Sequence, residues 1–202
     1  MRRGFGKGMM GIGALIIFIA VILIAAVAAS VLITTGGSLQ QKALITGAQT
    51  EEAIASGIEA MTVVASDASA TDPEGSPHRV GDFKVMVRLQ SGSQGLNLNN
   101  TILTIDTETE STSLTYNETI STDATSASTL QYLVYYVQQG TNHEDGYLNR
   151  GDVAKIIFKL DPEISENQLI RLKLIPRVGT YTQVEFYTPD SMTQESVALW
   201  PT

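Results

Sequence analysis

Side chains that could carry out chemistry are few in this sequence and lie far apart. The two histidines are His78, in a proline-rich stretch, and His143, in a polar one. Neither stands in a metal-binding or nucleophile motif, and no glycine-rich phosphate loop occurs. Cysteine is absent, which excludes thiol catalysis, disulfides and cysteine-ligated metals. The sequence therefore predicts no catalytic residues and no cofactor.

One short segment carries several oxygen ligands of the kind that calcium prefers. Residues 142–146 read Asn-His-Glu-Asp-Gly. They lack the ladder of spaced acidic residues and the terminal glutamate of an EF-hand loop. We interpret the segment as a solvated turn and predict no metal site.

Two asparagines stand in the triplet that N-glycosylation requires. Asn99 is followed by Asn-Thr and Asn117 by Glu-Thr, without proline in the middle position. Residues 103–128 are rich in Thr and Ser, which is typical either of solvated edge strands or of a glycan-bearing or partner-facing surface. We expect at least one of the two asparagines to be modified.

A long uncharged segment lies near the N-terminus and is the main structural element that the sequence predicts. No charged residue occurs from Met9 to Gln41, and apolar residues then recur at three- or four-residue spacing. The first twenty-five residues of this run would form a helix about 37 Å long, enough to cross a bilayer. We expect one helix over residues 9–66, bent at Gly36-Gly37 and at Gly47.

Two interpretations of the basic N-terminus differ in whether this helix is retained. A secretory signal peptide would be cut after Ala28. A prepilin-type leader, residues 1–8, would instead be cut between Gly8 and Met9 with Lys7 beside the cut; Arg3-Gly4 is a weaker alternative. The apolar pattern continues past residue 28 and favours retention. A retained helix stays in lipid or packs against copies of itself, because each large apolar side chain gains about 1.5–3 kcal/mol on burial.

The N-terminal sequence resembles that of archaeal flagellins (archaellins). MRRGFGKG matches a basic leader that ends in Lys/Arg-Gly, and the following MMGIGALIIFIAVILIAAVAASVLI has glycines at its third and fifth positions, Gly11 and Gly13. Gly13 stands where bacterial type IV pilins carry a glutamate. Leu160-Asp161-Pro162, Leu174-Ile175-Pro176 and residues 178–189 resemble the family's terminal strands, whereas residues 67–149 contribute nothing to the resemblance.

The resemblance implies a non-enzymatic structural subunit of the archaellum, an extracellular filament used for swimming. Its partners would be copies of itself or paralogous subunits, a leader peptidase and a membrane-bound assembly ATPase, with the subunit inserted in the membrane before assembly. The N-terminal helices would form the filament core and the β domains its sheath. The residues expected in helix contacts are Gly11, Gly13, Phe18, Ala20 and Leu23. The alternatives are an archaeal type IV adhesion pilin and a membrane-tethered carbohydrate- or protein-binding module, which needs an exposed platform such as Tyr132, Tyr135 and Tyr136.

The remainder of the chain is acidic and strand-like. The formal net charge of −8 excludes a basic nucleic-acid surface. We expect a hinge over residues 67–79 and, over residues 80–202, an antiparallel β-sandwich of immunoglobulin-like topology, so the fold class is α+β. A fragment from Val80 onward should fold alone. Strand-like runs occur at residues 83–89, 100–105, 113–116, 131–137, 153–160, 170–174, 184–186 and 196–200.

Overall fold

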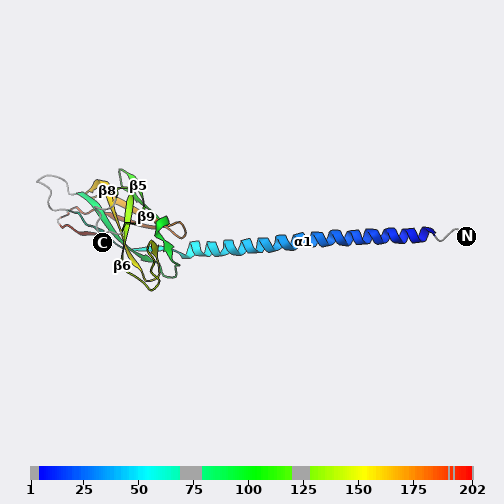
Figure 1. The fold of residues 1–202 in the computed structure, drawn as a ribbon. Coiled ribbons are helices and arrows are strands. Elements are labelled where there is room, and N and C mark those ends of the chain that lie inside the picture. Colours follow the sequence, from blue (N-terminus) through cyan, green and yellow to red (C-terminus); the bar gives the residue numbers. More distant parts are fainter. Residues whose placement is uncertain (1–4, 69–78, 120–127, 191, 193, 202) are drawn as a thin grey trace. The chain divides into compact units, whose positions relative to one another are not determined.

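The computed structural model describes residues 5–68, 79–119, 128–190, 192 and 194–201. They form two compact units, residues 1–50 and 51–202. Figure 1 shows one long helix, α1 (Phe5–Ala55), and a β domain that follows it along the chain. The predicted α+β fold class is confirmed, since a long N-terminal helix precedes a mostly antiparallel β domain. The immunoglobulin-like sandwich topology stays a prediction.

The helix α1 is uninterrupted over 51 residues. It continues without a break through Gly36, Gly37 and Gly47, where a bend stays a prediction. A helical glycine costs about 1 kcal/mol relative to alanine, which weakens a helix without ending it. Ala and Ile are the commonest residues of α1, and proline, which would break the hydrogen-bond ladder, is absent from it.

The predicted C-terminal boundary of the helix, residue 66, was wrong. The helix ends at Ala55, and residues Ile58–Ala65 form the strand β1. Apolar residues at three- to four-residue spacing suggested a helix. The same residues also fit a strand, because a bulge in β1 lets both Ile58 and Ala65 face the core. The β-branched residues Thr62, Val63 and Val64 favour the strand.

Contacts from the β domain fix the end of α1. The Ser93 hydroxyl donates to the carbonyl oxygen of Ala55 at 3.1 Å and accepts from the Gly57 N–H at 3.0 Å. A side chain at Gly57 would meet Gln90 Oε1 at 2.5 Å and Thr180 Oγ1 at 2.8 Å. Glycine therefore allows the chain to turn from helix to strand against its neighbours.

Among the described residues, nine strands form one sheet in the order β10-β9-β4-β5-β6-β8-β2-β1-β11, and β3 pairs with β7. All pairs are antiparallel except β5 with β6. The eight predicted strand runs correspond to β2, β4, β5, β6, β8, β9, β10 and β11. The remaining bounds are β2 (Arg79–Leu89), β3 (Leu96–Asn97), η1 (Leu98–Asn100), β4 (Ile102–Asp106), β5 (Ser111–Asn117), β6 (Gln131–Gln138), β7 (Tyr147–Leu148), β8 (Val153–Ser165), β9 (Leu169–Ile175), β10 (Thr182–Tyr187) and β11 (Val197–Trp200).

The sheet curls so that its two ends meet. The Thr180 N–H donates to the Ser56 carbonyl oxygen at 2.8 Å, and the Thr182 hydroxyl donates to that of Ile58. These bonds join the start of β10 to the start of β1. Phe83 and Phe158 stack at 5.5 Å within the enclosed core.

The β domain begins earlier than predicted, because residues Ile58–Ala65 form a strand and not the end of the helix. Strand β1 lies between β2 and β11, so the β domain includes residues that precede the predicted hinge and does not begin at Val80. Of the predicted hinge, residues 69–78, including His78, lie outside the described residues. Asp67, which precedes them, accepts the Gly81 N–H at 2.9 Å.

Candidate assembly surface

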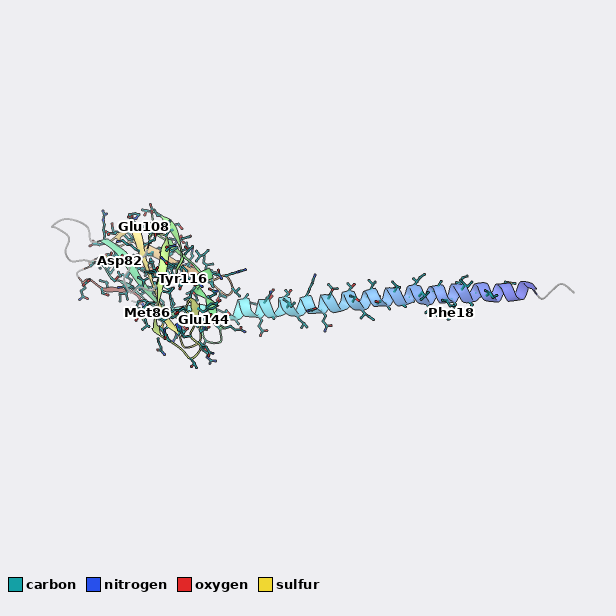
Figure 2. The ribbon with its side chains drawn as sticks, in the orientation of Figure 1. Phe18, Asp82, Met86, Glu108, Tyr116 and Glu144 are labelled. Carbon is teal, nitrogen blue, oxygen red and sulfur yellow. The ribbon has the colours of Figure 1, made fainter. Side chains whose placement is uncertain are left out.

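The surface of α1 is apolar on all sides. From Met10 to Thr50 every residue is exposed except Gly13, which is half-buried. Figure 2 labels Phe18 on this segment, whose side chain is 63% exposed. A helix without a polar stripe is stable only inside a larger assembly or a membrane. The surface of α1 is therefore one that a partner must cover.

By length and composition, α1 could cross a membrane, and it is the one helix among the described residues that could. Exposed large side chains follow one another closely, including Phe18, Leu23 and Ile24 at 61–69% exposure. Burying each would be worth about 1.5–3 kcal/mol. Lipid or other helices of the same kind could both provide this burial.

The predicted contact residues lie on two faces of α1. Gly11 and Phe18 are seven residues apart, as are Gly13 and Ala20, so each pair shares one face of the helix. Apart from the adjoining residues and the nearby backbone of α1 itself, no atom of the described residues lies within 4 Å of the position that a Cβ would take at Gly11 or Gly13. Packing within the subunit thus does not require these glycines, whereas close approach of another helix favours small residues.

The predicted leader cleavage lies near the start of α1. The helix begins at Phe5, so the backbone of Lys7, Gly8 and Met9 is helical. Arg2 and Arg3 lie outside the described residues. Cleavage before Met9 stays a prediction.

The two glycosylation candidates differ in their surroundings. Asn99 lies in η1 and is exposed, and within the described part of the chain its carboxamide has no hydrogen-bond partner. Asn117 lies at the end of β5 and is half-buried. Its Nδ2 donates to Gln131 Oε1 at 3.1 Å, and its Oδ1 accepts from the Thr119 N–H and hydroxyl at 3.1 and 3.0 Å.

The three tyrosines of β6 do not form an exposed platform. Tyr132 is fully buried, and its hydroxyl lies 2.9 Å from both the Leu98 and Thr101 carbonyl oxygens. Tyr136 is half-buried and donates to the Tyr147 carbonyl oxygen at 2.8 Å. Burial raises the pKa of both phenols above the usual value. Only Tyr135 is exposed, so this cluster is chiefly core packing.

A cavity of about 360 Å³ lies beside these tyrosines. Tyr116, labelled in Figure 2, lines it together with Tyr135 and Tyr136. Glu118 and Asp145 add carboxylates. The Tyr116 ring meets Tyr132 edge to face at 5.9 Å, so it too is held by core packing.

The predicted turn at residues 142–146 is organised by a buried carboxylate that the sequence did not single out. Asp152 is 1% exposed and accepts the N–H groups of Gly140 at 2.6 Å and Asn149 at 2.9 Å. His143 Nδ1 lies 3.4 Å from Asp152 Oδ2, and its Nε2 lies 3.2 Å from Asp145 Oδ1. Among the described residues no group of three or more metal-ligating side chains converges.

Comparison with known proteins identifies the chain's relatives. A sequence model of archaeal-type flagellin matches residues 8–186. Flagellin B1 of Methanococcus voltae is 34% identical over 213 residues, covering 96% of this chain and 95% of the relative. Flagellin B1 of Methanocaldococcus jannaschii is 30% identical and covers 96% of this chain and 95% of the relative.

Two solved structures share the fold. The crystal structure of archaeal flagellin FlaB1 from Methanocaldococcus jannaschii aligns with a TM-score of 0.61 at 20% identity, covering 72% of this chain and 97% of that one. The archaeal flagellum of Methanospirillum hungatei strain JF1 aligns with a TM-score of 0.67 at 18% identity, covering 94% and 98%. From the family match and the full-length relatives, this chain is a member of the archaeal-type flagellin family.

Proposed function

We propose that the chain is a structural subunit of the archaellum, in which α1 forms the core of an extracellular filament and the β domain its sheath. The observation that carries this proposal is the exposed apolar surface of α1, since among the described residues from Met10 to Thr50 all but Gly13 are exposed. Membership of the flagellin family supports the same function.

The maturation route follows from the two environments that an apolar helix tolerates. Before assembly α1 lies in the membrane, and afterwards it packs against other copies of itself or of paralogous subunits. A leader peptidase removes residues 1–8, and a membrane-bound ATPase drives assembly. The supporting feature is the abrupt change from a leader with three basic residues to an uncharged run.

A charge in the middle of the core tests this architecture. Ala20→Asp places a carboxylate on each helix within a run that has no basic residue to pair with it. An unpaired buried carboxylate costs several kcal/mol, and each added subunit repeats that cost. We expect the variant to lose filaments, scored by electron microscopy, and to lose swimming.

Ala20→Ser is the matched control, since it adds a small polar group without charge and should assemble. The subunit level in the membrane fraction, measured by immunoblot, separates failed assembly from failed production. Normal Ala20→Asp filaments would show that α1 does not form the core. The adhesion alternative is tested in a strain that cannot swim by design. If that strain makes the filaments and adheres only when this subunit is present, the protein functions in adhesion instead.

A further inference from the structure

The helix α1 carries few charged residues after Met9: one is basic, and the others, closer to its C-terminal end, are acidic. From Met9 to Ala55 the only charged residues are Lys42, Glu51 and Glu52. Lys42 and Glu51 are both exposed. Within the described part of the chain neither of these two takes part in an ion pair.

Neither residue has an opposite charge within reach on its own helix. Side chains three or four positions apart meet on a helix surface. Around Lys42 these positions hold only uncharged residues, and the same is true around Glu51. The neighbours of Lys42 are Ser38, Leu39, Ile45 and Thr46; those of Glu51 are Gly47, Ala48, Ile54 and Ala55.

Lys42 and Glu51 also cannot meet each other within one subunit. Nine residues separate them along α1. At the usual helix geometry this is about 13.5 Å along the axis and about two and a half turns. The two side chains therefore point to opposite sides of the helix.

Apolar side chains flank the lysine on its own face of the helix. Leu39 and Ile45, three positions before and after it, are 61% and 51% exposed. Any helix that covers them also approaches Lys42, and a cation taken out of water is tolerated when an opposite charge pairs with it. The surface that must pack against another helix thus carries one cation that lacks a partner.

We infer that Lys42 of each subunit pairs with Glu51 of a neighbouring copy displaced by about 13.5 Å along parallel helix axes. The inference rests on the proposed function, since it requires that helices of separate copies pack together. Because the two charges lie on opposite faces, each subunit binds one neighbour through Lys42 and another through Glu51. Such a head-to-tail contact does not close on itself and propagates as a helical polymer.

Exchanging the two charges tests the pair. Lys42→Glu and Glu51→Lys each place like charges together and should lower the mass of filaments per cell at least about tenfold, as removal of a buried partner does. The double variant restores the attraction in the opposite sense and should return to within about twofold of the natural protein. Single variants that assemble normally, or a double variant no better than the singles, would overturn the pairing.

A charge change elsewhere serves as the control. Glu108, labelled in Figure 2, is exposed in the loop between β4 and β5. Glu108→Lys alters the net charge by the same amount as Glu51→Lys. Filament mass should stay near normal in this variant, and combining it with Lys42→Glu should not rescue assembly; rescue would show that net charge, and not the pair, is what matters.

Chemical cross-linking of natural filaments gives a second measurement that needs no variant. A carbodiimide joins an amine to a carboxylate in contact without adding a spacer. We expect a Lys42–Glu51 linked peptide from filaments and none from subunits dispersed in detergent, because the two residues are too far apart within one chain. Filaments that give no such peptide contradict the inference.

The two proposals fail separately. If Ala20→Asp abolishes filaments while the charge variants assemble normally, α1 forms the core but the Lys42–Glu51 pair does not exist. If Ala20→Asp filaments are normal, the helix is not the core and both proposals fall.

Discussion

At the scale of single residues, the hydrogen bonds of the two sequon asparagines show which one is more available for glycosylation. Asn99 is an exposed residue whose carboxamide lies beside Gly146 without a hydrogen bond among the described residues, whereas the Asn117 carboxamide is held by Gln131 and Thr119. Glycosylation replaces a hydrogen on Nδ2, the atom that Asn117 uses as its donor to Gln131. Modification at Asn117 therefore competes with a contact that modification at Asn99 does not disturb.

We predict that Asn99 is the more fully glycosylated of the two. Mass spectrometry of filament peptides gives the occupancy of each site, and Asn99→Gln should remove most of the glycan mass. Asn117→Gln is the matched variant and should change the mass less. Full occupancy at Asn117 beside a bare Asn99 would reverse the ranking, and two bare asparagines would refute glycosylation itself.

Sequence triplets can find such asparagines, but they cannot rank them. The partner of Asn117 is Gln131, fourteen positions away, and β5 and β6 bring the two together as a parallel pair. Asp152 gave no signal either, because a turn aspartate that binds Gly140 and Asn149 looks in sequence like any solvated one. Contacts between distant strands decide both cases.

At the scale of elements, the strand β1 belongs to the β domain, so the domain begins well before residue 80. It pairs with β2 from Ile58 to Ala65 and is the only strand in the sheet beside β11 among the described residues. Ile58 and Val63 are 3% and 0% exposed. Their burial alone is worth about 3–6 kcal/mol, comparable with the total stability of many domains.

We therefore predict that a fragment of residues 56–202 folds and that one of residues 80–202 does not, contrary to the expectation from sequence. Circular dichroism and thermal unfolding of the two fragments decide this. The shorter fragment should aggregate, since β2 would present an unpaired edge. A cooperative unfolding transition for residues 80–202, equal to that of the longer fragment, would show that β1 is dispensable.

The strands that the sequence predicts best are those with strict alternation. Val85 and Val87 in β2 and Leu172 and Leu174 in β9 are all buried, as their two-residue spacing predicts. The start of β1 was misassigned because helix and strand patterns overlap over so short a run. The junction of α1 and β1 depends on Ser93 and Thr180, which are far away in sequence.

At the scale of the whole molecule, the long apolar helix and its likeness to archaellins were sufficient to predict both family and fold class. The order of strands was not predictable, because which strands become neighbours depends on non-local pairing. The closure of β10 onto β1 links positions 124 residues apart in the sequence.

The mature chain should begin at Met9. Lys7, if retained, would carry a charge into the dry interior of the helix bundle, at a cost of several kcal/mol unless paired. N-terminal sequencing or the intact mass of filament protein gives the start directly. A start at Ala29 would instead indicate a secretory signal peptide and a filament without this core.

The two-residue link between α1 and β1 has a mechanical consequence. Tension on the helix reaches β1 through Ser56 and Gly57, and β1 is hydrogen-bonded to a strand on each side. A pull along β1 would load both ladders together in shear instead of opening them bond by bond. The N–H bond from Thr180 to Ser56 anchors the entry point as well. The torque of a rotating filament would then enter the β domain at a strand that is paired on both sides, so the domain would resist unravelling.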